Sequence, residues 1–185
     1  MRCTTSHKRA ILALMKINVV LFQPEIPQNT GNISRTCSAT GCALHLVHPL
    51  GFSLDERHLR RAGLDYWDGL EIHEYPDNDA FFSEHTLEKM WLFSQKGTRN
   101  YWDIRSEELF SDKDIWLVFG RESRGLDEDL LLRCRERCVR IPMLEGKRSL
   151  NLSNAVAVAV YEVLRRTGFE GLKVTGALAK GGPDA

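Results

Sequence analysis

The 185-residue sequence has no excess of charge of either sign, because 25 lysines and arginines balance 25 aspartates and glutamates. This balance excludes a protein that coats a nucleic acid with a uniformly basic surface, so any contact with phosphates must come from a local group of basic side chains. The sequence also lacks an apolar run of the roughly 20 residues that a membrane-spanning helix needs. A hydrophobic share of 43% is enough for the core of one globular domain.

Cysteines are few, and no pair of them forms a CxxC motif. The five are Cys3, Cys37, Cys42, Cys134 and Cys138. Their odd number and irregular spacing favour a reducing compartment over a disulfide framework, which predicts a cytoplasmic protein. The last two lie four residues apart, but no histidine pair with ligand spacing follows them, so we expect no metal site.

The sequence contains neither a Gly-Lys-Ser/Thr phosphate loop nor a GxGxxG motif. The motifs that usually indicate binding of a nucleoside triphosphate or a dinucleotide are therefore absent.

Short, nearly continuous apolar runs alternate with stretches of helical character, which predicts an α/β fold with a mostly parallel sheet flanked by helices. The expected strands are residues 17–22, 43–47, 90–93, 115–119 and 138–141, and the expected helices are residues 30–39, 55–61, 79–89 and 127–135. Residues 15–171 are expected to form one domain, with residues 1–14 and 172–185 as flexible ends. Ligands of such sheets bind beyond the carboxyl ends of the strands, so the loops there are the candidate sites.

The last of these loops, within residues 140–166, is crowded with small polar residues that include Ser149 and Asn151. It runs into a helix that is apolar all round and is expected to lie in the core. Polar residues between two buried elements indicate a binding site, although the same residues would also serve as a simple helix cap.

Residues 24–41 follow the first expected strand. Asn29 or Thr30 can cap the helix that follows, and Arg35 lies farther along it, where its guanidinium can bind a phosphate or carboxylate at two points. An ordinary capped helix with a surface arginine is the alternative.

Two further segments carry candidate residues. Arg57, Arg60 and Arg61 share one face of an expected helix and form a basic stripe that could follow a nucleic-acid backbone, unless it is only a solvated face. Gly120 and Glu122 lie in a charged turn after the fourth expected strand, where glycine permits a ligand to approach the backbone.

Three of these segments, taken in order, resemble a known family. PEIPQNTGNISRTC, LVFGRESRGL and RIPMLEGKRSLNLSNAVAVAVYE closely resemble the three motifs of the SPOUT-superfamily RNA 2'-O-ribose methyltransferases. LRRAGLDYW is similar to the branch that modifies the wobble nucleotide of tRNA, a cytidine or uridine at position 34. The resemblance covers residues 17–171.

The resemblance implies a C-terminal trefoil knot, a rare exception to unknotted topology, together with a homodimer, S-adenosylmethionine bound in the knot and tRNA as substrate. It implies catalytic roles for Arg35, Asn29, Glu122 and Asn151, and cofactor binding by Phe93, Gly120, Ile141, Ser149 and Leu150. The basic stripe is expected to bind RNA. Transfer of an activated sulfonium methyl to a ribose hydroxyl needs positioning and removal of one proton, and no metal.

Alternatives remain open at this point. One is methylation of ribosomal RNA or of another tRNA position, and another is an RNA-binding protein that has lost catalysis. A cysteine hydrolase built on Cys37 with His45 or His48 is the third, but no acid is placed to orient the histidine, and the cysteine is expected to face the core.

Overall fold

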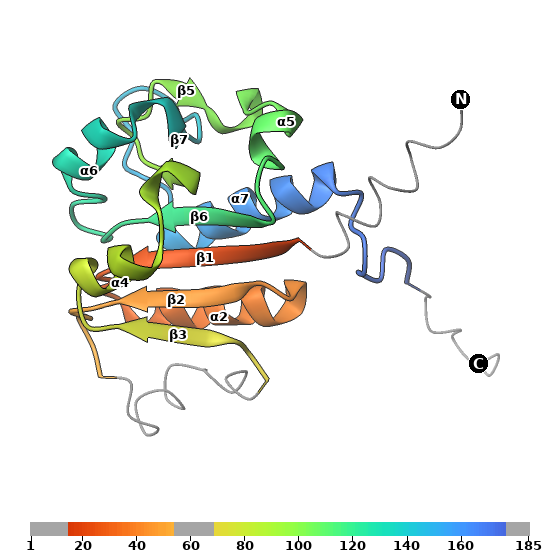
Figure 1. Cartoon of the computed structure of the whole chain (residues 1–185), viewed down its shortest axis with the longest axis horizontal. Coiled ribbons are helices and arrows are strands. Elements are labelled where there is room, and N and C mark those ends of the chain that lie inside the picture. The colour runs from red at the N-terminus through yellow and green to blue at the C-terminus, as the bar shows by residue number, and fades with distance from the viewer. Residues whose placement is uncertain (1–14, 54–68, 177–185) are drawn as a thin grey trace, which may run out of the picture.

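The computed structural model describes residues 15–53 and 69–176, and its centre is a seven-stranded sheet in which every strand pair is parallel (Figure 1). The strand order across the sheet is β3-β2-β1-β6-β4-β7-β5. The strands are β1 (Lys16–Phe22), β2 (Ala43–Val47), β3 (Ile72–Tyr75), β4 (Met90–Phe93), β5 (Arg99–Asn100), β6 (Asp114–Phe119) and β7 (Cys138–Arg140).

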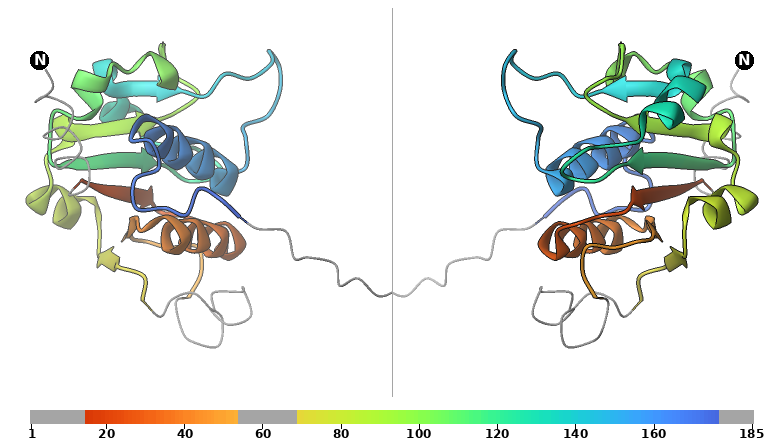
Figure 2. Two further views of the ribbon diagram at one scale, coloured as in Figure 1. Left: turned by 90° about the vertical axis from the view of Figure 1, so that its right-hand side faces the viewer. Right: turned by 90° about the vertical axis from the view of Figure 1, so that its left-hand side faces the viewer.

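Helices lie on both faces of the sheet. They are α2 (Pro27–Thr40), α4 (Asn78–Glu84), α5 (Ser106–Leu109), α6 (Glu128–Arg133) and α7 (Leu152–Arg166), with short 3-10 turns η1 (Leu87–Lys89), η2 (Tyr101–Asp103) and η3 (Arg135–Arg137). α2 and α7 lie side by side on one face (Figure 2). α4 and α6 supply side chains to the core of the opposite face.

The central strand β1 shows why the sheet needs cover on both sides. Its side chains alternate between faces, so Val19 and Leu21 belong to the core under α2 and α7, whereas Val20 and Phe22 belong to the core under α4 and α6. All four are at most 5% exposed. The sequence expectation of an α/β fold with a mostly parallel sheet between helices is confirmed.

The five strands expected from the sequence are present, with ends that differ by one residue at most. The prediction of one helix over residues 79–89 is wrong, because this segment is divided into α4 and η1. His85 adopts an extended conformation after α4, and its Nε2 lies 2.9 Å from the hydroxyl of Tyr75. The histidine ring also packs on Trp116, and these two contacts hold His85 in the extended conformation that ends the helix.

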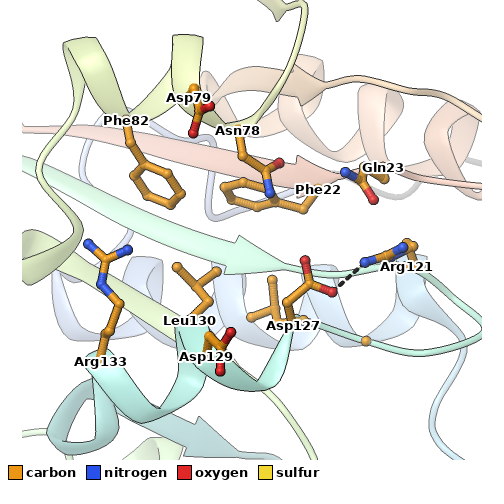
Figure 3. A pocket seen from close by; sticks show the side chains of 12 residues that line it. Phe22, Gln23, Asn78, Asp79, Phe82, Arg121, Asp127, Asp129, Leu130 and Arg133 are labelled. Carbon is orange, nitrogen blue, oxygen red and sulfur yellow. Dashed lines mark hydrogen bonds and ion pairs between the residues drawn. The ribbon is translucent and has the colours of Figure 1, made fainter.

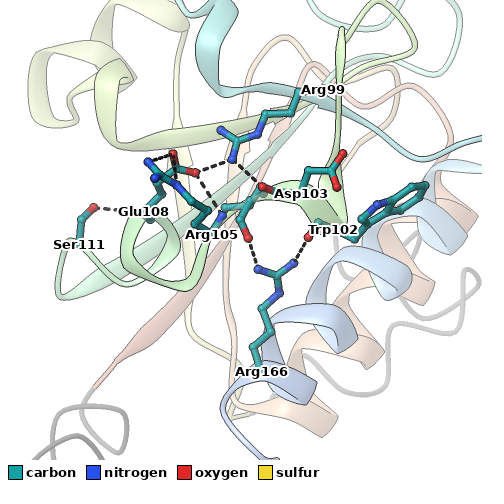
Figure 4. A network of polar contacts seen from close by, with 8 residues as sticks. Arg99, Trp102, Asp103, Arg105, Glu108, Ser111 and Arg166 are labelled. Carbon is teal, nitrogen blue, oxygen red and sulfur yellow. Dashed lines mark hydrogen bonds and ion pairs between the residues drawn. The ribbon is translucent and has the colours of Figure 1, made fainter.

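β3, β5 and α5 were not expected, because each is short and carries polar residues. The segment around β5 and α5 is held by charged side chains (Figure 4). Arg99 pairs with Glu108, and this contact is the main reason that the pKa of the Glu108 carboxyl falls to about 2. Arg166, in the last turn of α7, donates to the backbone carbonyls of Trp102 and Ile104. The connection between β4 and β6 is thereby fixed to the end of α7.

The expectation that α7 is apolar and buried all round is wrong for the single chain. Val156 and Val160 are fully buried, but Val158 is 36% exposed and Tyr161 is 49% exposed. One side of α7 therefore packs on the sheet and α2, while the other presents apolar side chains to the surface.

Two further findings bear on the expectations. The basic stripe Arg57, Arg60 and Arg61 lies outside the described residues. Within the described part of the chain, no helix combines the length and apolar character needed to cross a membrane.

The turn after β6 predicts an intolerance to any side chain at Gly120. A Cβ atom there would lie 2.1 Å from the backbone carbon of Gly125 and 2.3 Å from the backbone nitrogen of Leu126. We expect Gly120→Ala to lower the free energy of unfolding by about 3 kcal/mol, since backbone has to move. Urea unfolding measures this. Gly176→Ala, where a Cβ meets nothing within 4 Å, is the control and should unfold like the wild type. Equal stability of the two variants would contradict the close approach.

Candidate active site

The carboxyl ends of β6, β4 and β7 lie next to one another in the sheet. They bring together three of the residues proposed for cofactor binding, because Phe93 ends β4, Gly120 follows β6 and Ile141 follows β7. The ring of Phe93 stacks on Phe119 with centroids 4.9 Å apart. This edge of the sheet therefore offers an apolar surface beside the turn that follows β6.

A chain of side-chain hydrogen bonds joins the three motifs. Asn29 Nδ2 donates to Glu122 Oε1 at 2.8 Å, and Asn151 Nδ2 donates to Asn29 Oδ1 at 2.8 Å. Asn151 Oδ1 in turn accepts from the backbone nitrogen of Ser153 at 2.9 Å and from its hydroxyl at 2.6 Å. We call Glu122, Asn29, Asn151 and Ser153 the polar relay. Asn29 and Glu122 are 93 positions apart in the sequence, and Asn29 and Asn151 are 122 positions apart.

Glu122 also fixes the chain just before α2. Its carboxylate accepts from the backbone nitrogens of Glu25 at 2.8 Å and Ile26 at 3.3 Å. Glu25 returns the contact, accepting from the Ser123 backbone nitrogen at 2.9 Å and hydroxyl at 2.7 Å. These bonds from Ser123 hold the pKa of the Glu25 carboxyl below its usual value. The loops after β1 and β6 are thus clamped to each other in both directions.

The sequence expectation that Asn29 or Thr30 caps α2 is wrong. The helix begins at Pro27 with Ile26 as N-cap, and both polar residues lie buried in its first turn. Instead, the carboxylate of Glu122 accepts hydrogen bonds from the backbone N–H groups just before the helix. The side chain of Asn29 is therefore available to bridge Glu122 and Asn151. Asn151 does cap its helix, because its side chain accepts from Ser153.

Ser149 is placed by a residue that sequence reasoning missed. Gln95, in the loop after β4, donates from Nε2 to the Ser149 hydroxyl. Ser149 is exposed and Leu150 is 41% exposed, so neither is covered by the chain itself. The loop before α7 is therefore tied to the strand end that carries Phe93.

Arg35 stands apart from the polar relay. It is exposed on α2, six residues beyond Asn29, which corresponds to about 9 Å along the helix axis. The structure thus brings Glu122, Asn29 and Asn151 into contact and places Arg35 on the same helix at the surface.

Cys37 and His45 do not form a nucleophilic site. Cys37 is fully buried, and burial raises the pKa of its thiol. His45 is buried between Tyr75, at 2.9 Å, and Asn18, at 3.1 Å, and desolvation lowers its pKa to about 3. A cysteine hydrolase on this pair is excluded. Among residues 15–53 and 69–176, no group of three or more His, Cys, Asp or Glu side chains is arranged to hold a metal ion.

Comparison with known proteins identifies the family. A model described as the SpoU rRNA methylase family matches residues 16–161. The chain belongs to this family. The match spans all three motifs and confirms the resemblance that they indicated.

Relatives of this SpoU-family chain are similar over almost their whole length. A protein of Geobacillus stearothermophilus is 52% identical over 160 residues, which is 85% of this chain and 99% of the relative. A protein of Saccharophagus degradans named tRNA (cytidine(34)-2'-O)-methyltransferase is 48% identical over 84% of this chain and 99% of its own. A solved structure described as "Structural insights into the 2-OH methylation of C/U34 on tRNA" matches with a TM-score of 0.73 and 41% identity, covering 83% of this chain and 91% of that one.

Three residues of the candidate site were missed at the sequence level: Glu25, Gln95 and Ser123. Each lies within or beside a motif, so its presence near the site was visible in the sequence. Its partner was not, because each bond joins loops that are at least 54 positions apart.

The polar relay predicts a pH-dependent defect for Asn29→Asp. The new carboxylate would face Glu122 at the 2.8 Å now spanned by a hydrogen bond, at a site where Asn29 is 4% exposed. Repulsion and burial raise the folded-state pKa of the new carboxyl above its unfolded value, so stability falls as pH rises through that interval. We expect a loss of about 3 kcal/mol at pH 8 and a smaller loss at pH 5.

Thermal unfolding at the two pH values measures this effect. Asn32→Asp makes the same change at an exposed position of the same helix and serves as the control. A pH-independent loss in Asn29→Asp would show that Asn29 and Glu122 are not in contact.

Proposed function

We propose that this protein transfers a methyl group from S-adenosylmethionine to the ribose 2'-hydroxyl of nucleotide 34, a cytidine or uridine, of tRNA. The observation that carries the proposal is the polar relay, which joins the three motifs into one site in a chain whose 48% identical relative is named for this reaction. The residue types fit, because the reaction needs an oriented hydroxyl and stabilisation of developing charge.

The edge formed by Phe93, Gly120 and Ile141 fits the cofactor. The apolar stack of Phe93 on Phe119 suits a flat adenine, and the turn that begins at Gly120 lies beside it at the end of β6. Ser149 and Leu150 are exposed and held across from this edge by Gln95, so their backbone groups would hold the remainder of the cofactor. When bound, S-adenosylmethionine supplies an activated sulfonium methyl.

Arg35 is proposed to bind the phosphate beside the target ribose and to stabilise the alkoxide that forms as the 2'-hydroxyl loses its proton. A guanidinium is effectively always protonated, so it acts through its charge and not as the base. Glu122 accepts bonds from Glu25, Ile26 and Asn29. A carboxylate engaged in this way is a poor base, and we therefore assign it, with Asn29 and Asn151, to positioning the loops.

The basic stripe Arg57, Arg60 and Arg61 is proposed to position the anticodon stem, which remains a prediction because these residues lie outside the described part of the chain. The four described cysteines are free and buried, which agrees with a cytoplasmic protein.

A trefoil knot and a homodimer complete the proposal. β7 lies between β4 and β5, yet the chain that follows it returns to pack α7 against α2 and β6, as threading through the β4–β6 connection would require. The exposed Val158 and Tyr161 of α7 form an apolar face that a second copy would bury by two-fold symmetry.

Labelled S-adenosylmethionine and bulk tRNA from cells that lack the protein test the function. We expect one labelled ribose, located at nucleotide 34 by nuclease mapping. Label at another tRNA position, or on ribosomal RNA alone, would reject the assignment of the substrate.

Arg35→Lys tests the role of the guanidinium. Lysine keeps the charge but loses the planar fork, so we expect turnover to fall by about a hundredfold, the effect of losing one oriented donor at a developing oxyanion. Single-turnover methyl transfer gives the rate, and S-adenosylmethionine binding by calorimetry should be unchanged. Arg135→Lys, at an exposed position on η3, is the control. Near-normal turnover of Arg35→Lys would exclude two-point binding.

A further inference from the structure

A pocket apart from the candidate active site lies between α4 and α6, on the face of the sheet opposite α2 and α7 (Figure 3). Its volume is about 310 Å³. Residues from the end of β1, from α4, from the loop after β6 and from α6 line it. None of the residues assigned above to catalysis or cofactor binding lines it.

This pocket and the polar relay share two loops. In the loop after β6, Arg121 lines the pocket and pairs with Asp127, whereas the next residue, Glu122, binds Asn29 in the relay. In the loop after β1, Gln23 lines the pocket, whereas Glu25 is clamped to Ser123. A ligand in the pocket would therefore press on the same loops that hold the relay in place.

The floor of the pocket suits a flat apolar ring. Phe82, from α4, is half-buried and stacks on Phe22 with centroids 5.6 Å apart and planes 24° apart. Leu126 and Leu130 lie opposite as part of the same core. An inserted ring would extend the existing aromatic stack.

Polar groups surround the floor. The Oδ1 atom of Asn78 is buried and has no hydrogen-bond partner in the described part of the chain. Figure 3 shows this amide and the Phe82 ring pointing into the pocket, with Arg133 facing them from α6. Asp79 and Asp129 add carboxylates at the rim.

The charges decide what kind of ligand fits. The lining carries three carboxylates and two guanidiniums, and Arg121 is already paired with Asp127. An excess of acceptors disfavours a phosphate and favours a neutral group that donates hydrogen bonds. A nucleobase with an exocyclic amino group combines such donors with a flat apolar face.

We propose that this pocket binds one unpaired base of the tRNA anticodon loop, a base that bears an exocyclic amino group and flanks the methylated nucleotide. The proposal rests on the proposed function. The base is a flanking one because Arg35 belongs to α2 and Ser149 precedes α7, whereas the pocket lies on the opposite face of the sheet. Phe82 stacks on the base, while Asp129 accepts from its amino group. The seated base contacts the loops that carry the relay, which makes the pocket a determinant of substrate choice.

The test combines an RNA change with a protein change. Anticodon stem-loop RNAs carrying an abasic site at each unpaired position except 34 are methylated by the wild type and by Phe82→Leu, which keeps an apolar side chain but loses the ring. We expect one abasic position to raise KM by about tenfold with the wild type, the effect of losing one stacked base. Phe82→Leu should raise KM for the intact RNA by the same factor and should show no further increase with that abasic RNA.

A matched pair of charge changes supplies a second readout. Asp129→Asn removes a carboxylate at the pocket, whereas Glu128→Gln, one residue earlier on α6, changes a carboxylate that pairs with Lys96 outside it. We expect only Asp129→Asn to weaken the preference for an amino-bearing base at the sensitive position. S-adenosylmethionine affinity and melting temperature should stay at wild-type values in both.

The outcomes separate the pocket from the function. Additive effects of Phe82→Leu and every abasic site, or equal behaviour of the Asp129 and Glu128 variants, would overturn the base pocket while methylation at nucleotide 34 persists. Absence of methylation at nucleotide 34 with the wild type would reject the proposed function itself.

Discussion

The contact on which the site depends is the hydrogen bond between Asn29 and Glu122. A side chain in the first turn of α2 and a carboxylate in the turn after β6 meet at 2.8 Å, and Asn151 adds the start of α7 to the same chain. Neighbouring β1 and β6 bring the loops close, but strand pairing alone leaves the loops free to move. The side-chain bonds remove that freedom, because each buried amide must find both a donor and an acceptor. Asn29 satisfies both requirements with residues from two other motifs.

The loops after β1 and β6 border two different sites. On the side of α2 and α7 they hold the groups assigned to methyl transfer, and on the side of α4 and α6 they form the wall of an open pocket. Gln23 shows how tightly the wall is built. It adopts a left-handed backbone conformation with φ of 52°, which residues other than glycine rarely adopt. Its backbone nitrogen donates to the carbonyl oxygen of Val47 at 2.8 Å. The loop after β1 is therefore fixed where it borders the pocket.

The strands buried on both faces were predictable from sequence, since β1, β2, β4 and β6 are near-continuous apolar runs. The motif residues were also found, because the family resemblance marks them. The pairings between motifs could not be predicted from the sequence. Asparagine is a residue type that often caps helices, and only the folded chain shows that Glu122 replaces Asn29 in that role. The division of the helix at His85 was hidden for the same reason, since it depends on Tyr75 and Trp116 in separate strands.

The two strands that the sequence did not reveal, β3 and β5, are the edges of the sheet. β5 is only two residues long, and β3 carries exposed His73 and Glu74 at its centre. Edges that are short and charged give an incoming strand little to pair with, so they oppose the sheet-to-sheet aggregation to which open parallel sheets are prone. The short length and polar residues that kept these strands from being recognised in the sequence therefore also oppose pairing between the edges of two sheets.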